Sequence, residues 1–180
     1  MTCRTVLLDT CVLINLLASG ECEEILRVLN HHWMVCSAVE KESVYLRTDN
    51  PPNSLELIDF APLISAGLIN VCGVNDEGEA NLYVNYASLL DDGEAMSLAL
   101  ALARGHALAT DERKARRLFL EATNEPGRLV GTSEIIREWV ESNSITDDKA
   151  KGVLLEITRR ARFFPSLNDP YYKWWSDICS

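Results

Sequence analysis

The stretch VLLDTCVLINLL, residues 6–17, places a single acid, Asp9, inside an otherwise apolar run. The segment TVLL that leads into this acid is β-branched and aliphatic, which predicts a buried strand, and a helix is expected from about Thr10. A near copy of this arrangement follows at 107–110, where ALAT leads into Asp111 and a charged helix, DERKARRLFLEA. Two predicted strands therefore each end on an aspartate.

The rest of the chain alternates between the two kinds of element. Further strands are predicted at 33–37, 68–74 and 128–130, and residues 54–60 are compatible with either helix or strand. Helices are predicted at 23–29, 37–46, 77–90, 91–105, 132–141 and 147–163. Such alternation implies βαβ crossovers and a parallel sheet covered by helices on both faces. We therefore expect an α/β fold with three layers, α/β/α, and a central, mostly parallel sheet.

Length and composition favour one compact unit. The chain has 180 residues, of which 47% are hydrophobic, and it contains no linker rich in proline, glycine or serine. Its formal net charge of -10 argues against a protein that coats nucleic acid through a large basic surface, although a local basic groove stays compatible with it. The apolar run near the N-terminus is interrupted by Asp9 and Asn15 and is too short to span a membrane. These features indicate a cytoplasmic protein.

The cysteine and histidine residues do not form a zinc-ligand pattern. Six cysteines are scattered without a CxxC pair, and the three histidines lack the spacing of zinc ligands. Reduced thiols that pack as small apolar groups are the expected state.

Asp9 and Asp111 are expected to project from one edge of the sheet, provided that their strands run parallel within it. Ligands bind in such folds beyond the carboxyl ends of the strands. The alternative is that each aspartate only caps the helix that follows it. For either residue alone, the sequence leaves both interpretations open.

Two glutamates extend this set of acids. Ser37 and Glu40 have the spacing of a capping box, which leaves Glu42 available to face the edge of the sheet. Glu94 has the same spacing from Asp91, so a capping role is the alternative for it.

Together with the two aspartates, these glutamates would repel one another strongly unless a cation held them. Oxygen ligands suit Mg²⁺ or Mn²⁺, and crowding should raise at least one carboxyl pKa in the metal-free protein.

The pattern resembles the PIN domain nucleases, in particular the VapC-like toxins and related prokaryotic proteins. The resemblance rests on four segments: LLDTCVLINLL, SAVEKES, GEAMSLALALA and ATDERKAR. It implies that four acids are both catalytic and metal-binding, namely Asp9, Glu42, Glu94 and Asp111. It also implies that Thr10 and Thr110 support the site.

Some assignments stay open within this resemblance. Glu40 could replace Glu42, and Asp91 or Asp92 could replace Glu94. The resemblance further implies a single PIN-like domain over residues 1–180, with a core at about 1–130 and extra C-terminal helices at about 131–180.

The activity that the resemblance implies is metal-dependent hydrolysis of phosphodiester bonds in single-stranded or structured RNA, with Mg²⁺ or Mn²⁺ as cofactor. The protein would be the toxin of a toxin-antitoxin pair. Its expected partners are RNA as substrate, an antitoxin protein and a second copy of the chain, without a membrane. The alternative is a catalytically inactive PIN-like module for binding or assembly.

Cations near the acids would have to meet the phosphates of an RNA strand. The candidates lie on the helix after Asp111, and a solvated helix face is the competing explanation for them. They are Arg113, Lys114, Arg116 and Arg117.

Overall fold

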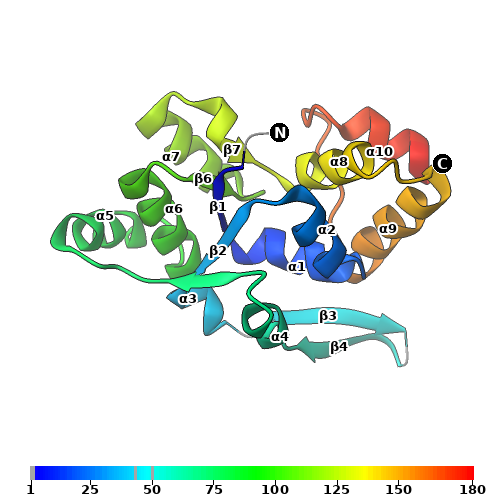
Figure 1. Cartoon of the computed structure of the whole chain (residues 1–180), viewed down its shortest axis with the longest axis horizontal. Coiled ribbons are helices and arrows are strands. Elements are labelled where there is room, and N and C mark those ends of the chain that lie inside the picture. Colours follow the sequence, from blue (N-terminus) through cyan, green and yellow to red (C-terminus); the bar gives the residue numbers. More distant parts are fainter. Residues whose placement is uncertain (1–2, 43, 50) are drawn as a thin grey trace. The chain divides into compact units, whose positions relative to one another are not determined.

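The computed structural model describes residues 3–42, 44–49 and 51–180. Its strands are β1 (Thr5–Leu8), β2 (His32–Cys36), β3 (Val44–Asp49), β4 (Pro52–Ile58), β5 (Asn70–Cys72), β6 (Ala107–Ala109) and β7 (Leu129–Val130). Its α-helices are α1 (Thr10–Ala18), α2 (Cys22–Leu29), α3 (Ser37–Glu40), α4 (Ala61–Ser65), α5 (Glu77–Ala87), α6 (Asp92–Arg104), α7 (Arg113–Thr123), α8 (Thr132–Ser142), α9 (Asp147–Arg160) and α10 (Tyr172–Cys179) (Figure 1). A short 3-10 helix, η1 (Pro126–Arg128), precedes β7.

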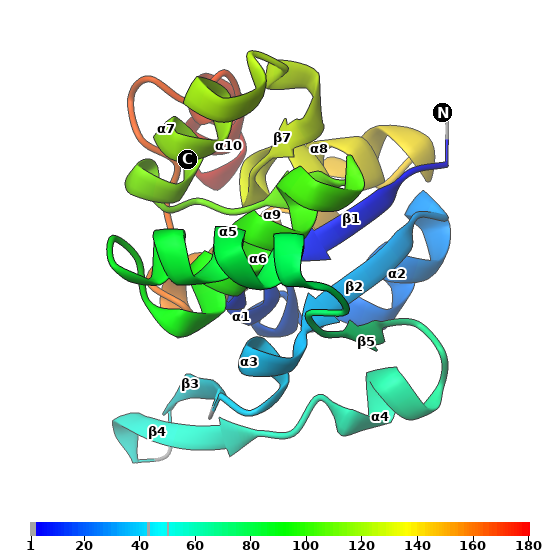
Figure 2. The ribbon, with the colours of Figure 1, turned by 90° about the vertical axis from the view of Figure 1, so that its left-hand side faces the viewer.

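Five strands form one parallel sheet in the order β5-β2-β1-β6-β7. β1 lies in the middle, with Val6 paired to Trp33 of β2 and to Ala107 of β6. Figure 2 shows β1, β2 and β5 running side by side. The predicted α/β fold with a central parallel sheet flanked by helices is confirmed. The side chains of β1 explain its place, because Val6, Leu7 and Leu8 are fully buried, as expected for a strand with neighbours on both sides.

The order of the strands reverses at β1. From β1 the chain builds the sheet outward through β2 and β5, and it later returns to place β6 on the opposite side of β1. Ligands of open α/β sheets bind at such a switch point, beyond the carboxyl ends of the strands. The carboxyl ends of β1 and β6 carry Asp9 and Thr110.

Helix α6 covers the middle of the sheet and contacts β1, β2 and β6. It begins where the side chain of Asp91 accepts a hydrogen bond from the N–H of Glu94, 3.0 Å away, and it ends at Gly105, which has a φ of 66°. The cap and the glycine stop agree with the prediction for 91–105. Leu98 and Ala99 lie in the fully buried middle of the helix.

The predicted helix over 37–46 is wrong. Helix α3 ends after four residues at Glu40, and β3 begins at Val44; residue 43 lies outside the described residues. The reason is an alternation of period two, since Val44 and Leu46 are 1% exposed and Tyr45 between them is 47% exposed.

The strand alternative for 54–60 is the one that the structure adopts. This segment contributes β4, which pairs with β3 as an antiparallel hairpin.

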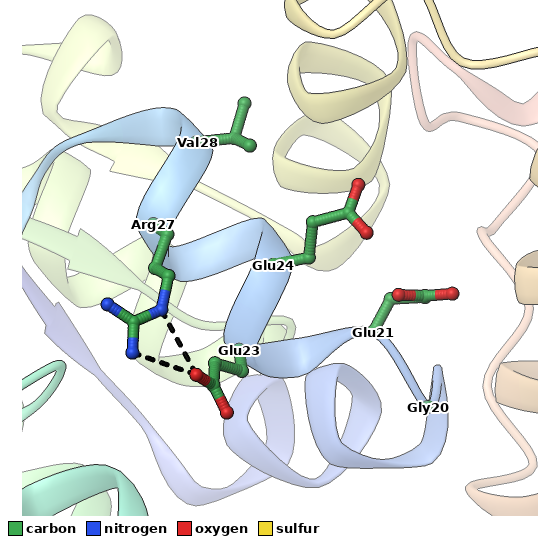
Figure 3. A pocket seen from close by; sticks show the side chains of 6 residues that line it. All are labelled: Gly20, Glu21, Glu23, Glu24, Arg27 and Val28. Carbon is green, nitrogen blue, oxygen red and sulfur yellow. Dashed lines mark hydrogen bonds and ion pairs between the residues drawn. The ribbon is translucent and has the colours of Figure 1, made fainter. Parts of the chain in front are cut away.

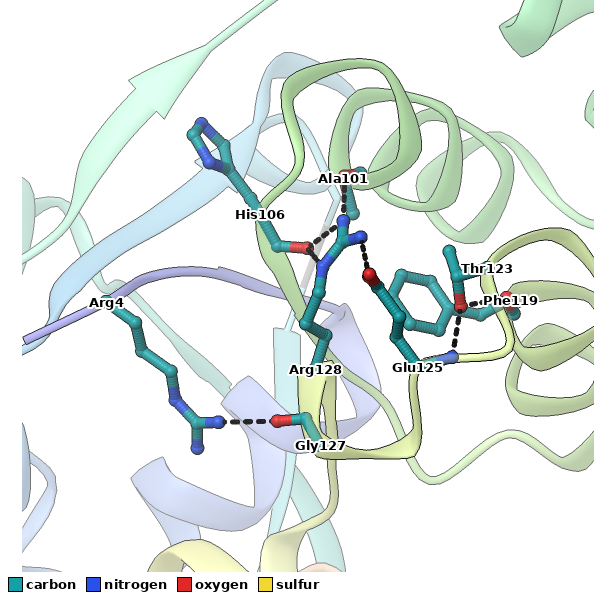
Figure 4. Close-up of polar contacts among 8 residues, drawn as sticks. All are labelled: Arg4, Ala101, His106, Phe119, Thr123, Glu125, Gly127 and Arg128. Carbon is teal, nitrogen blue, oxygen red and sulfur yellow. Dashed lines mark hydrogen bonds and ion pairs between the residues drawn. The ribbon is translucent and has the colours of Figure 1, made fainter. Parts of the chain in front are cut away.

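Arg128 attaches the β7 segment to the neighbouring elements (Figure 4). Its Nε donates to the carbonyl oxygen of His106 at 3.2 Å, and its Nη2 donates to that of Ala101 at 3.0 Å. Nη1 forms an ion pair with Glu125, and Arg4 donates to the carbonyl oxygen of Gly127 at 3.0 Å. These bonds hold the last strand of the sheet beside β6 and α6.

The chain divides into two compact units. Unit 1 consists of Met1–Val12, His31–Glu42 and Phe60–Gly131, and it contains the five-stranded sheet. Unit 2 consists of Leu13–Asn30, Ser43–Asp59 and Thr132–Ser180. The single domain over residues 1–180 stays a prediction.

The core of unit 2 is built around two fully buried tryptophans. They are Trp139 on α8 and Trp175 on α10. The ring of Trp175 packs edge-on against Phe163, with 5.6 Å between ring centroids. Helix α2 contacts α8, and α9 contacts both α10 and β3. Among the aromatic residues near the C-terminus, Trp175 therefore belongs to a packed core.

Among the described residues, every helix is too short or too polar to cross a membrane. The six cysteines are all thiols, and three of them, Cys22, Cys36 and Cys72, are buried.

Candidate functional site

Asp9 is a buried carboxylate at the carboxyl end of β1, with only 2% of its surface exposed. Its Oδ1 accepts the backbone N–H of Thr10 at 2.8 Å, and its Oδ2 accepts the hydroxyl of Thr110 at 2.7 Å and the thiol of Cys11 at 3.3 Å. Burial raises the pKa of Asp9, and these hydrogen bonds oppose the rise. The fold therefore keeps the Asp9 carboxylate in a buried position, where its charged form is energetically unfavourable.

Glu42 lies beside the start of α1, although it is not on a helix. It follows α3, its N–H donates to the carbonyl oxygen of Val39 at 3.1 Å, and its Oε2 accepts the Thr10 hydroxyl at 2.6 Å. Burial raises its pKa, and so do the charges of Asp91, Asp9 and Asp92. Glu42 can lie this close to α6 because residue 93 is a glycine. A Cβ at that position would lie 2.2 Å from Oε1 of Glu42.

Glu94 occupies the first turn of α6, and the prediction that crowding raises a carboxyl pKa applies to it. Burial and the charges of Asp91, Asp9 and Glu112 raise its pKa to about 7. Its N–H is the one that Asp91 caps, so the capping assignment holds for the backbone of Glu94 while its carboxylate interacts with the other acids.

Asp111 follows β6 by two residues, and Gly131 after β7 makes room for it. A Cβ at Gly131 would lie 2.9 Å from Oδ1 of Asp111. The backbone N–H of Asp111 donates to Cys11 Sγ at 3.4 Å, and the charges of both Asp9 and Asp111 act on that thiol. The two aspartates that the sequence places at one edge therefore both approach Cys11. The N-cap of α7 is Glu112, not Asp111.

Three residues that contact the predicted acids or act on them by charge are not among the four predicted site residues. Asp91 was only an alternative to Glu94, and Glu112 and Cys11 were not predicted. Asp91 acts on Asp9, Glu42 and Glu94 through its charge, and Glu112 acts on Glu94. Cys11 bridges the two aspartates. Glu112 is adjacent to Asp111 in sequence, which is the only local signal for it, and nothing in the sequence singles out Cys11.

Two of the alternatives are arranged differently. The capping box of Ser37 and Glu40 is wrong, because Cys36 precedes α3 without a side-chain cap and the Ser37 hydroxyl donates to Met96 Sδ at 3.6 Å. Glu40 itself is exposed. Asp92 Oδ1 accepts the hydroxyl of Tyr83 at 3.2 Å.

The basic residues of α7 have mainly structural partners. Arg116 donates from Nη1 to the carbonyl oxygens of Thr110 at 2.7 Å and Val130 at 3.1 Å, which joins the ends of β6 and β7. Lys114 donates to the carbonyl oxygen of Leu89, and Arg117 pairs with Glu121 at 3.6 Å. These contacts favour the explanation of an ordinary helix face over that of an RNA-binding surface.

The acids fit a hard cation by their chemistry. All four predicted ligands offer oxygen atoms, and glycines at 93 and 131 allow two of the carboxylates to approach where any other residue would fill the space. Among the residues that the structure describes, no three acid, cysteine or histidine side chains are grouped as a ready-made metal site. The donor set therefore suits Mg²⁺ or Mn²⁺.

Unit 2 has a pocket of its own on α2, of about 450 Å³, lined by Gly20, Glu21, Glu23, Glu24, Arg27 and Val28 (Figure 3). Its acids are engaged in ion pairs, because Arg27 donates to Glu23 Oε1 at 2.8 Å and Lys149 donates to Glu24 Oε2 at 2.8 Å. This pocket carries no buried acid comparable with Asp9.

Comparison with known proteins identifies the family. A family profile described as a PIN domain matches residues 5–168, which includes all four predicted acids. Comparisons with curated proteins and with solved structures give no match. PIN domains generally have a nuclease-type fold and use divalent metal ions. The match covers most of the chain, and the protein therefore belongs to the PIN domain family.

Proposed function

We propose that this protein is an endoribonuclease that depends on Mg²⁺ or Mn²⁺. The observation that carries the proposal is the buried carboxylate of Asp9, held by three hydrogen bonds at the switch point of the sheet while the charge of Asp91 acts on it. A buried charge of this kind costs stability unless an opposite charge compensates it. Binding of a divalent cation is the compensation that the acids support.

Each predicted site residue has a role in this proposal. Asp9, Glu42, Glu94 and Asp111 would hold the cation, which when bound activates a water molecule and stabilises charge on the phosphoryl oxygens. Thr10 and Thr110 are positioning residues, because their hydroxyls fix the carboxylates of Glu42 and Asp9.

The toxin role is a further part of the proposal. It is supported by the resemblance to VapC-like toxins, and it implies an antitoxin protein that covers the acids. Co-expression with the product of a neighbouring small reading frame tests it: the toxin role requires that this product binds the protein and suppresses cleavage.

The alternative function, an inactive PIN-like binding or assembly module, would retain the fold alone. The crowded acids speak against it, since a scaffold gains nothing from carboxylates whose burial and mutual repulsion raise their pKa values.

Cleavage of a labelled single-stranded RNA in Mn²⁺ or Mg²⁺ tests the proposed activity. We expect cutting by the intact protein that stops with a chelator and in Asp9→Asn. The matched control is Asp148→Asn, which changes an exposed aspartate in the first turn of α9 and should cut normally. Cutting that persists in Asp9→Asn would contradict the proposal, as would Mn²⁺ binding without cleavage of any RNA tested.

A further inference from the structure

A pocket of about 340 Å³ opens next to the acids. It lies within unit 1 between α3, α5 and α6, and it is lined by Ser37, Ala38, Lys41, Glu42, Tyr83, Asp92 and Met96. Its volume is at the lower end of the range for small-molecule sites, roughly 300–1,000 Å³. Glu42 belongs both to this pocket and to the acid cluster, so the two are contiguous.

The walls of the pocket combine apolar surface with a few polar groups. Ala38, Met96 and the ring of Tyr83 provide flat or flexible apolar surface, which suits a planar ring. Asp92 accepts the Tyr83 hydroxyl at 3.2 Å, and an ionised carboxylate can accept about four hydrogen bonds, so it retains acceptor capacity. Lys41 is the one cationic side chain among the described residues that line the pocket.

We propose that this pocket binds a guanine base of the RNA, next to the phosphate that the acid site would cleave. The inference rests on the proposed ribonuclease activity for its substrate class. It rests on the pocket itself for the choice of base.

Guanine is the base whose edges match both polar groups. Its N1–H and N2–H₂ are adjacent donors, which a carboxylate such as Asp92 can accept together, and its O6 and N7 are acceptors for the ammonium of Lys41. Adenine and cytosine place a ring-nitrogen acceptor beside their single amino group, and that acceptor would face the carboxylate. Uracil offers one N–H between two carbonyl oxygens.

The surrounding charge supports a base in this pocket over a phosphate. Glu42 and Asp92 line it, and two carboxylates repel a phosphate group but accept neutral N–H donors. In single-stranded RNA the Watson–Crick edge is available for such contacts, and bases are commonly held between aromatic and apolar side chains. The pocket would therefore distinguish the four bases by the hydrogen-bond donors on their edges, because the phosphate group is the same in all four nucleotides.

Binding of the four ribonucleoside 5′-monophosphates to the full chain tests the assignment, in a chelator so that no metal contributes. Met96 provides the reporter, because its ¹³C-labelled methyl group lies in the pocket and its NMR signal can be assigned by its loss in Met96→Leu. Met34 on β2, which does not line the pocket, serves as the internal reference. We expect GMP to shift the Met96 signal at concentrations about tenfold lower than those required for AMP, CMP or UMP.

Variants then test the two polar groups. Asp92→Asn should reduce the preference for GMP about tenfold, since an amide cannot accept two donors side by side, and Lys41→Gln should weaken GMP binding without affecting UMP. Glu77→Gln is the matched control, an exposed acid in the first turn of α5 outside the pocket. Tyr83→Phe retains the ring but removes the hydroxyl that Asp92 accepts, and it should retain selectivity for GMP. That result would show that a loss of selectivity in Asp92→Asn does not come from a local fold defect around this hydrogen bond.

The outcomes separate this inference from the proposed activity. Equal binding of all four monophosphates, or an equal loss in Glu77→Gln, overturns the guanine pocket even if the protein cuts RNA. Selective binding of GMP by a protein that cuts no RNA supports the pocket and counts against the nuclease.

Discussion

The carboxylate of Glu42 lies directly against Gly93 at the start of α6, so closely that a Cβ on residue 93 would be 2.2 Å from Oε1 of Glu42. Such a distance is far inside van der Waals contact. The absence of a side chain at this one position allows an acid from the loop after α3 to reach the first turn of α6, where Glu94 is located.

Gly93→Ala should therefore displace the Glu42 carboxylate and weaken Mn²⁺ binding by at least tenfold. The fold should survive, because the end of the Glu42 side chain can move and the Val39 methyl group, 3.3 Å from the added Cβ, has to shift only slightly. The higher helix propensity of alanine, about 1 kcal/mol over glycine, helps to offset that shift. Isothermal titration with Mn²⁺ and urea unfolding measure the two effects. The control is Gly152→Ala on α9, where nothing lies within 4 Å of the added Cβ; this variant should gain stability and bind Mn²⁺ normally. Unchanged binding in Gly93→Ala would exclude Glu42 as a ligand.

Asp9→Asn should retain the folded stability of the metal-free protein to within about 1 kcal/mol. The amide can still accept the N–H of Thr10, and the Thr110 hydroxyl can turn to accept an N–H from it, while an unfavourable buried charge is removed. Asp9→Ala, in contrast, leaves buried donors without an acceptor and should cost about 1–3 kcal/mol. Urea unfolding of both variants in a chelator measures the difference. If Asp9→Asn unfolded as easily as Asp9→Ala, the carboxylate would be structural.

The proposed metal site predicts that Mn²⁺ stabilises the intact protein by mass action, because a ligand that binds only the folded state shifts the folding equilibrium. At a hundredfold excess over the dissociation constant the gain is about 2.7 kcal/mol, which appears as a rise in melting temperature. Asp111→Asn should abolish most of this rise. Asp148→Asn should leave it intact. A melting temperature that does not respond to millimolar Mn²⁺ would count heavily against a metal site at these acids.

The ion pair of Glu79 and Arg104 should dominate the acid sensitivity of unit 1. Glu79 is 5% exposed and accepts two hydrogen bonds from Arg104, at 2.6 and 2.8 Å, and these bonds lower its pKa to about 2. A lowered folded-state pKa stabilises the fold above the unfolded value of about 4.5, and that contribution is lost as the pH falls from 4.5 towards 2.

Glu79→Gln should cost about 3 kcal/mol at pH 7, because Arg104 keeps a largely buried charge, and the difference from the intact protein should shrink below pH 4.5. Unfolding in urea at a series of pH values measures it. Glu23→Gln, which breaks the exposed pair with Arg27, should cost under about 1 kcal/mol at any pH. A cost for Glu79→Gln that does not vary with pH would contradict the role assigned to the pair.

The sequence predicts the strand positions of Asp9 and Asp111 well because both depend on a local signal. An apolar run that ends on an acid is visible in a few residues, and parallel pairing then brings the two ends together. The alternation of strands and helices was sufficient to predict the parallel sheet. Helix α6 was predictable as well, because its N-cap and the glycine at its C-terminus are local sequence signals.

Glu42 shows where local patterns fail. The spacing of Ser37 and Glu40 favours a long helix, yet the chain turns into a hairpin whose two strands pair residues as far apart as Val44 and Ile58. The stability gained from this non-local strand pairing outweighs the local preference for a helix. The close approach to Gly93 and Gly131 is likewise tertiary, because it depends on which side chains meet across the sheet edge. The identities of the metal ligands and the base specificity stay predictions.

The central strand β1 has one neighbour that is made much later than itself, since Val6 pairs with Ala107. During synthesis, Asp9 and Glu42 leave the ribosome long before β6 and Asp111 do, so the growing chain carries some of the acids well before the sheet edge that gathers them exists. For the proposed ribonuclease, this order means that no short nascent chain bears an assembled site beside ribosomal RNA.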